Sequence, residues 1–273
     1  MSLYRGMDRT ALDLAYNNSA AVPGVEAVIR EWDERSVALR AKREHRAGIA
    51  YGPAPRNTID WFPADKGAPV IVFIHGGYWQ RNAAPLTHFV GEAALDRGIA
   101  VAHLEYTLAP DATLSAIVAE IGAGLDFLRA NLAAMGGDPG RVYLTGHSAG
   151  GHLIAAHWAH PAIAGAIPIS GLFELEPIAL GKLNDPLHLT AEEIDRHSPI
   201  RRIPQTSTPL RLIVGGDELP ELRRQTADYA TACRAAGHAV EELPSPGYNH
   251  FTVLDELALP QGRVLGAVLD LLE

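Results

Sequence analysis

Short apolar runs and longer stretches of mixed polarity alternate along most of this chain. The run at 70–74, Val-Ile-Val-Phe-Ile, is continuous, which is typical of a central strand covered on both faces. Such an alternation of strands and helices predicts an α/β fold, with a mostly parallel central sheet, right-handed crossovers and helices on both faces. Further strands are predicted at 99–104, 141–145, 162–169, 210–214 and 239–243, and helices at 85–97, 114–134, 151–158, 220–236 and 260–272.

Two stretches depart from the alternation. Residues 1–47 precede the first clear strand, and their apolar positions from residue 8 onward suit helices with one buried face, so they predict an N-terminal helical extension packed over the domain. Short strands are predicted next, at 48–52 and 58–62. Residues 171–205 are rich in proline and hold short amphipathic pieces, which predicts a small cap or lid over the strand ends. We expect residues 1–273 to form one domain.

Composition narrows the classes of function. The chain has 273 residues, enough for one sizeable core, and its net charge of −9 makes nucleic acid a poor partner. The sequence contains no run of eighteen apolar residues, so no membrane-spanning helix is expected. The first residues do not resemble a secretory signal. Cys233 is the single cysteine, so no intrachain disulfide is expected and a reducing cytoplasm suits the protein. The oligomeric state is left open, a homodimer included.

One motif carries the candidate chemistry. Gly146-His147-Ser148-Ala149-Gly150 lies between a predicted strand and a predicted helix. A serine flanked by glycines at both two-residue offsets in that context is the pattern of a nucleophile elbow, whose tight turn exposes the serine hydroxyl above the sheet. An ordinary glycine-rich turn would share the pattern, so the other predicted loops decide between the two.

A serine hydroxyl needs a general base, and the base needs a carboxylate that orients it. The chain order of serine, acid and histidine predicts Ser148 as nucleophile, Asp217 as acid and His250 as base, because Asp217 and His250 each follow a late strand. Glu218 or Asp185 are the alternatives for the acid. All these loops follow strand ends, where ligands of open α/β sheets bind.

Negative charge that develops on a carbonyl oxygen needs preorganised N–H donors. His75-Gly76-Gly77 follows the central strand, and we expect the N–H groups of Gly76, Gly77 and Ala149 to form the oxyanion hole. Tyr78 and Trp79 come next and are candidates for the walls of the substrate pocket, although both are also common packing residues.

A metal site is the competing interpretation of the histidines near the elbow. His152, His157 and His160 are separated by five and three residues, with no paired carboxylate motif. That spacing matches no common zinc motif, so we expect no metal ion.

Five motifs carry a resemblance: His75-Gly76-Gly77-Tyr78-Trp79, residues 106–110, 146–153 and 220–225, and His250-Phe251. Together they resemble the hormone-sensitive-lipase-like branch of the α/β-hydrolases, and within it the kynurenine formamidase (arylformamidase) group. This resemblance implies an α/β-hydrolase fold and hydrolysis of N-formylkynurenine to kynurenine and formate, a step of tryptophan catabolism, without a cofactor. Tyr78 stands where a third glycine is often found, which puts bulky acyl groups in doubt. Arg81 and Arg223 are candidates for binding the substrate's polar end.

Two alternatives stay open. Relatives of this type include carboxylesterases acting on short-chain or aryl esters, which need the same triad. The second alternative is a binding protein on a hydrolase scaffold that has lost catalysis. Such a protein typically lacks the base or the nucleophile, whereas this sequence keeps Ser148 and His250.

Overall fold

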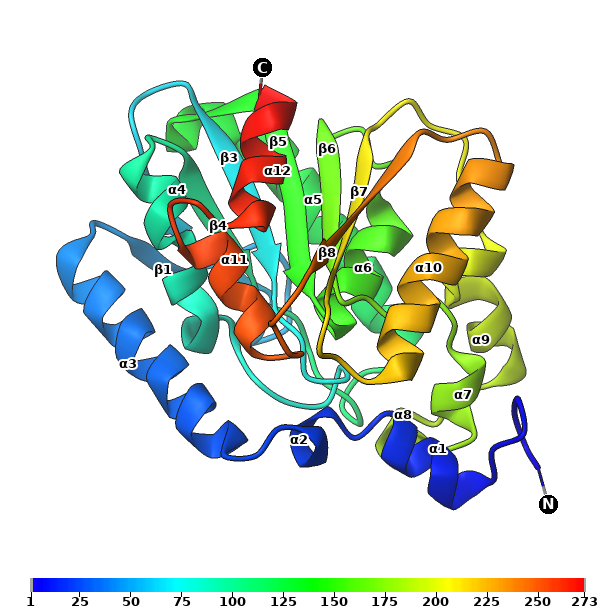
Figure 1. Cartoon of the computed structure of the whole chain (residues 1–273). Coiled ribbons are helices and arrows are strands. Elements are labelled where there is room, and N and C mark those ends of the chain that lie inside the picture. The colour runs from blue at the N-terminus through cyan, green and yellow to red at the C-terminus, as the bar shows by residue number, and fades with distance from the viewer. Residues whose placement is uncertain (1, 273) are drawn as a thin grey trace.

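Eight strands form one sheet in the order β1-β2-β4-β3-β5-β6-β7-β8 (Figure 1). In this computed structural model, which describes residues 2–272, β3 to β8 are parallel, while β1 and β2 are antiparallel to their neighbours. The predicted α/β fold is confirmed. The elements are α1 (Arg9–Ala15), α2 (Asn18–Ala21), α3 (Val25–Lys42), β1 (Arg46–Ala50), β2 (Thr58–Phe62), β3 (Ala68–Ile74), η1 (Ala84–Gly91), α4 (Glu92–Asp96), β4 (Ala100–Leu104), α5 (Leu114–Met135), β5 (Gly137–His147), α6 (Ala149–His157), β6 (Gly165–Ile169), α7 (Glu176–Ala179), α8 (Asn184–Leu187), α9 (Ala191–His197), η2 (Pro199–Arg201), β7 (Leu210–Gly215), α10 (Pro220–Ala235), β8 (Val240–Ser245), η3 (Thr252–Leu254), α11 (Asp255–Ala258) and α12 (Arg263–Leu272).

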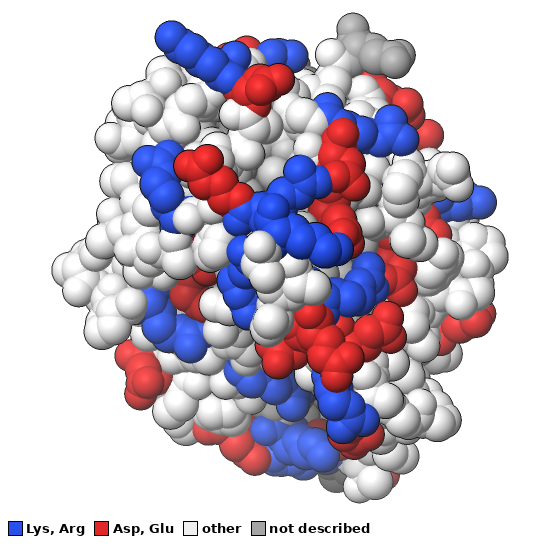
Figure 2. Space-filling model, turned by 90° about the vertical axis from the view of Figure 1, so that its left-hand side faces the viewer, with Lys and Arg blue, Asp and Glu red and all other residues white. Residues whose placement is uncertain are grey.

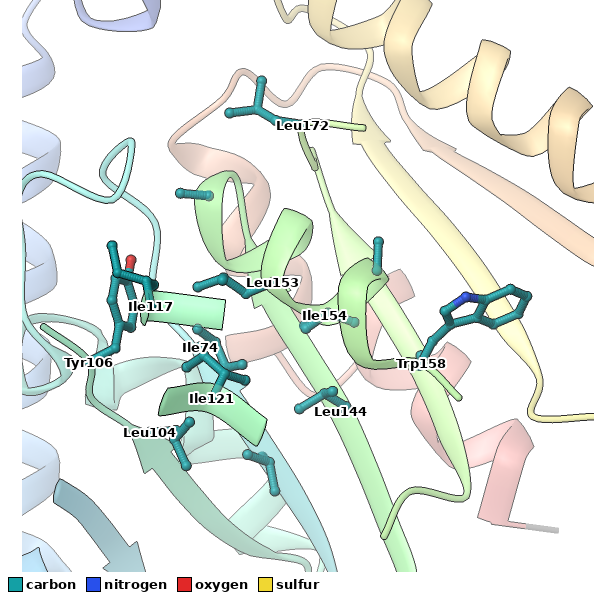
Figure 3. Close-up of a cluster of buried hydrophobic side chains, with 14 of the residues drawn as sticks. Ile74, Leu104, Tyr106, Ile117, Ile121, Leu144, Leu153, Ile154, Trp158 and Leu172 are labelled. Atoms are coloured by element: carbon teal, nitrogen blue, oxygen red, sulfur yellow. The ribbon is translucent and has the colours of Figure 1, made fainter. Parts of the chain in front are cut away.

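The central strand β3 is buried on both faces, as its continuous apolar run predicted. Val72 and Ile74 pack into the core beneath α5, α6 and α10, whereas Ile71 and Phe73 pack into the core beneath α3, α4 and α12. Figure 3 shows the first of these cores, where Ile74 and Leu144 of the strands meet side chains of α5 and α6. Burial of each such side chain contributes about 1.5–3 kcal/mol, so the two layers hold the strand ends rigidly.

The predicted N-terminal helical extension consists of three helices, α1, α2 and α3. Pro23 and Gly24 separate α2 from α3, and Gly24 has φ +73°, a conformation that favours glycine. Figure 1 shows α3 along one face of the sheet, with α1 and α2 crossing the edge where the parallel strands end. Leu12 and Tyr16 are almost fully buried there, so this segment is part of the core rather than an appendage.

Residues 171–205 hold the short helices α7, α8, α9 and η2. They pack beside α5, α6 and α10. They also contact the N-terminal segment: the backbone N–H of Lys182 donates to Asp13, and Asp185 pairs with Arg9. This stretch therefore supports α1 from one side.

The outer face of α3 carries charges of both signs in close alternation (Figure 2). Arg43 pairs with Asp96, and Arg35 pairs with Asp255 at 2.6 Å, which ties α3 to α4 and α11. Because neighbouring charges offset one another, this face presents no field of a single sign, despite the net charge of the chain.

The strand order also fixes where a ligand would bind. Strand β3 lies between β4 and β5 in the sheet. The connection after β3 runs to β4 on one side, and the chain then returns to β5 on the other side of β3. In an open α/β sheet such a reversal leaves a crevice at the carboxyl ends of the two strands, here β3 and β5, where ligands bind. Ile74 pairs with Gly146, which sets the residues after both strands next to one another. Helix α6 starts directly against β3: a Cβ on Gly150 would lie 2.0 Å from the carbonyl oxygen of Ile74.

Gly150→Ala is therefore expected to lower the free energy of unfolding by about 1–3 kcal/mol or more, because a backbone atom would have to move. Gly266→Ala in α12 is the control: its added methyl meets nothing within 4 Å, and it should leave stability unchanged or raise it by about 0.5–1 kcal/mol. Urea unfolding measures both. Equal stabilities of the two variants would contradict the close contact between α6 and β3.

Candidate active site

Ser148 occupies a strained turn between β5 and α6. Its φ of 55° and ψ of −115° lie outside the ordinary regions for a residue with a side chain, at a cost of about 1–3 kcal/mol. The turn is held because the backbone N–H of Ser148 donates to the carbonyl oxygen of Ile169 at 2.8 Å, and because Gly146 and Gly150 let the backbone approach Ile74. This is the geometry expected of a nucleophile elbow.

His250 lies in the loop after β8 and is 5% exposed. Its Nδ1 is 2.6 Å from Oε2 of Glu218, so the carboxylate fixes which ring nitrogen carries the proton and leaves Nε2 free to act as a base. Glu218 is itself held in place. Its Oε1 accepts hydrogen bonds from the backbone N–H of Gly215, at 2.8 Å, and from the hydroxyl of Ser170.

The prediction of Asp217 as the acid is wrong, because the carboxylate that contacts His250 is that of Glu218. Strand β7 extends to Gly215, and in the turn that follows the N–H of Glu218 donates to Gly215 while Asp217 points outward and is exposed. The side chain of Glu218 therefore turns inward, and it is one methylene longer, which lets it reach His250. Asp185, the other alternative, is a surface partner of Arg9. A shift of one residue in a turn leaves no signal in the pattern of apolar positions.

The loop after β3 approaches the elbow closely. A Cβ on Gly76 would lie 3.0 Å from the Cβ of Ser148, so only glycine leaves room there. Gly77 has φ +120°, and a Cβ there would meet the carbonyl oxygen of Arg81 at 2.3 Å. Within residues 2–272, the N–H groups of Gly76 and Gly77 donate to no protein acceptor, and Ala149 is the first residue of α6, where helical N–H groups have no intrahelical partner. These three N–H groups are available to an oxyanion.

A buried ion network anchors this loop from behind. Oε1 of Glu105 accepts hydrogen bonds from Nε2 of His75 at 2.9 Å and from Arg56 at 2.8 Å, and its Oε2 accepts one from the N–H of Ala84. Burial raises the pKa of Glu105, but the hydrogen bonds and positive charge of His75 and the backbone donors outweigh it and hold this pKa below its usual value. Sequence reasoning missed Glu105, although it directly precedes the 106–110 motif.

Ser148, His250, Gly76 and Gly77 all line one cavity of about 110 Å³. The opposite wall comes from the N-terminal segment and includes Trp32. No residue of 171–205 lines this cavity, so the cap predicted there does not cover the site; α2 and α3 do so instead. The N-terminal residues of the wall are Asn18, Ser19, Ile29 and Trp32.

Tyr78 and Trp79, both predicted as pocket walls, separate in the structure. Tyr78 lines the cavity, and its hydroxyl donates to the carbonyl oxygen of Tyr16 at 2.7 Å while accepting from Asn18 at 3.2 Å. Trp79 is fully buried away from the cavity, with its ring edge-on to His152, so its prediction as a substrate-binding residue is wrong. Two consecutive positive φ values, 53° and 60°, turn the two side chains in different directions.

The histidines of α6 and the turn after it serve the fold. The ring of His152 bonds to the carbonyl oxygen of His197, that of His157 to the carbonyl oxygen of Leu153, and that of His160 pairs with Asp126. Across residues 2–272 no group of three or more metal-ligating side chains is positioned to hold an ion, and no helix is long and apolar enough to cross a membrane.

The strained serine, the histidine–carboxylate pair and the free N–H groups at the strand ends define an enzyme of the α/β-hydrolase class, of the serine-hydrolase type. Comparison with known proteins agrees. Residues 62–159, which include both glycine motifs, match the BD-FAE family model.

The chain is also similar over nearly its whole length to the kynurenine formamidase of Danio rerio, with 27% identity over 94% of each chain. An isoprenylcysteine alpha-carbonyl methylesterase of Arabidopsis thaliana is 38% identical, but over only 41% of this chain and 27% of the relative. Among solved structures, a Silicibacter sp. TM1040 protein provisionally described as a thioesterase has a TM-score of 0.85 and 27% identity over 94% of this chain and 98% of that one. The resemblance noted in the sequence is confirmed.

Glu218→Gln should lower kcat by about 10³- to 10⁴-fold, because a neutral amide no longer stabilises the imidazolium or fixes the tautomer of His250. Asp217→Asn, one residue away and exposed, is the matched control and should retain nearly full activity. Steady-state kinetics on an activated ester measure both, with thermal unfolding as the check on folding. The opposite order of effects would restore Asp217 as the acid.

Glu105→Gln should reduce stability at pH 7 by about 3 kcal/mol, because it leaves His75 and Arg56 without their buried counter-charge. The folded pKa of Glu105 is lowered, so its contribution is fully present above its unfolded pKa of about 4.3 and is lost as the pH falls through the lower folded value. The difference in unfolding free energy between wild type and variant should therefore narrow below about pH 4. A difference that does not change between pH 7 and pH 3 would refute this assignment.

Proposed function

We propose that this protein is an arylformamidase: it hydrolyses a formamide on an aromatic amine, with N-formylkynurenine as the substrate, to release the amine and formate. The observation that carries the proposal is the arrangement of Ser148, the His250–Glu218 pair and the Gly76-Gly77 loop around one small cavity. The similarity to kynurenine formamidases over 94% of the chain supports the choice of substrate.

In this mechanism His250 takes the proton of Ser148 as its oxygen adds to the formyl carbonyl carbon. The carbonyl oxygen, now negative, receives hydrogen bonds from Gly76, Gly77 and Ala149. His250 then gives the proton to the leaving nitrogen, the C–N bond breaks and the aromatic amine departs, which leaves a formyl ester on Ser148. Water attacks this ester with His250 again as base, and formate is released. Glu218 stays ionised and stabilises the imidazolium in both halves.

The shape of the cavity supports a small acyl group joined to an aromatic leaving group. Tyr78 closes one side, and its hydroxyl is committed to Tyr16 and Asn18, so the ring cannot move aside without losing two hydrogen bonds. Trp32 and Phe251, whose ring centroids are 5.9 Å apart, supply an aromatic wall. A formyl group is the smallest acyl group, and it fits this restriction best.

The proposed setting is the cytoplasm, with a small-molecule substrate and no nucleic-acid partner. All residues named in the mechanism come from one chain, so the proposal does not depend on a homodimer. A carboxylesterase for short-chain or aryl esters remains the second candidate, since the same triad cleaves esters and the Arabidopsis relative is named as a methylesterase.

The decisive experiment compares kcat/KM on N-formylkynurenine with kcat/KM on p-nitrophenyl acetate, using the purified full chain. We expect the formamide to be the better substrate by at least about tenfold, and Ser148→Ala to lower both activities by several orders of magnitude with folding intact. Efficient ester cleavage with negligible formamide cleavage would select the esterase. If Ser148→Ala kept both activities, the proposed mechanism would be refuted. If a fluorophosphonate probe did not label Ser148, the non-catalytic binding protein would be favoured.

A further inference from the structure

His147, the residue before the nucleophile, is not used by the mechanism above, yet it lines the same cavity and is 5% exposed. Its Nε2 lies 2.7 Å from the backbone carbonyl oxygen of His250, and the centroids of the two rings are 4.5 Å apart. The other ring nitrogen, Nδ1, has no hydrogen-bond partner within residues 2–272. Nδ1 is also not among the fully buried unpaired atoms, so it is open to the cavity, where a bound molecule can reach it.

The hydrogen bond of Nε2 fixes the protonation of this ring. A carbonyl oxygen only accepts, so Nε2 must carry the proton. Burial, together with the adjacent positive charge that His250 acquires, lowers the pKa of His147 well below its usual value, so the ring stays neutral. Nδ1 is therefore an unprotonated acceptor, and water or a donor group of the substrate can bond to it from the cavity.

The position of Nδ1 places it close to the reacting atoms. A Cβ built on Gly76 would lie 3.2 Å from Nδ1 of His147 and 3.0 Å from Cβ of Ser148. Nδ1, the nucleophile and the oxyanion loop thus surround one small region of the cavity.

We propose that Nδ1 of His147 accepts a hydrogen bond from the N–H of the scissile amide, and so makes the site selective for amides and formamides over esters. The inference rests on the proposed function, because it concerns the leaving group of the same reaction. When Ser148 adds to an amide carbonyl, the nitrogen becomes pyramidal, and its lone pair must face His250 to take the proton. The N–H then points away from His250, and an acceptor placed there stabilises the transition state. The corresponding ester oxygen carries no hydrogen, so an ester substrate gains no transition-state stabilisation from this acceptor.

Two substitutions separate the two nitrogens of the ring. His147→Gln can keep a donor near the position of Nε2, toward the carbonyl of His250, but it removes the acceptor at Nδ1. His147→Asn can place its amide oxygen near the position of Nδ1, but it loses the donor to His250. The first variant tests recognition of the substrate N–H, and the second tests support of the base.

The measurement is kcat/KM for a matched pair, formanilide and phenyl formate, with N-methylformanilide as the amide that lacks an N–H. His147→Gln should lower kcat/KM on formanilide by about 10- to 100-fold more than on phenyl formate. His147→Asn should lower both by similar factors, so that their ratio stays near that of the wild type. N-methylformanilide should be a poor substrate of the wild type and should not respond to His147→Gln.

An unchanged ratio of formanilide to phenyl formate in His147→Gln would overturn the inference and leave His147 as a residue that only positions His250. Negligible cleavage of all formamides by the wild-type enzyme, with phenyl formate still cleaved, would instead refute the proposed function. Thermal unfolding of both variants checks folding. If His147→Gln does not fold, the wild-type ratio of formanilide to N-methylformanilide decides alone, and a ratio near one overturns the inference.

Discussion

The close contact between helix α6 and the carboxyl end of strand β3 is the constraint on which this site depends. Gly146 and Gly150 both lie against the carbonyl oxygen of Ile74, at distances that no side chain tolerates. This contact leaves one residue, Ser148, to connect strand to helix in a strained conformation. The two apolar layers around β3 supply the stability that offsets the strain. Packing far from the cavity thereby holds Ser148, which is only 2% exposed, in the strained conformation that places it in the cavity wall.

The same contact organises the groups around the serine. Because β3 and β5 end in register, the Gly76-Gly77 loop lies directly beside the elbow, and Glu105 holds that loop through His75. Strands β7 and β8 lie two and three positions from β5 in the sheet, and Glu218 and His250 follow their carboxyl ends. These two residues therefore approach the serine from the side opposite the Gly76-Gly77 loop. The site is rigid because each chemical group is fixed by a strand end or by a buried hydrogen bond rather than by a free loop.

The N-terminal segment completes the site in a way that separates this protein from a bare hydrolase core. Tyr78 links the oxyanion loop to the backbone of Tyr16, and Tyr16 in turn bonds through its hydroxyl to Glu221 and Gln225 of α10. The small cavity is therefore closed by residues that precede the first strand, and its size depends on a contact between the start and the end of the chain. Together with a neutral His147 beside the serine, this closure is the physical basis of the proposed preference for a small acyl group on nitrogen.

The sequence by itself determined the α/β fold, and it singled out the residues now proposed as nucleophile, base and oxyanion loop. Continuous apolar runs and glycine spacing are local properties, and each strand end carried its motif with it. Tertiary structure alone decided the acid, because the choice between Asp217 and Glu218 depends on where β7 stops and on which way a single turn faces. It also decided that residues 18–32, rather than 171–205, cover the cavity, and that Tyr78 lines it while Trp79 does not. These outcomes depend on contacts between residues far apart in the sequence, 32 positions for Glu218 and His250 and 62 for Tyr78 and Tyr16. The pattern of apolar and polar positions along one chain carries no record of such contacts.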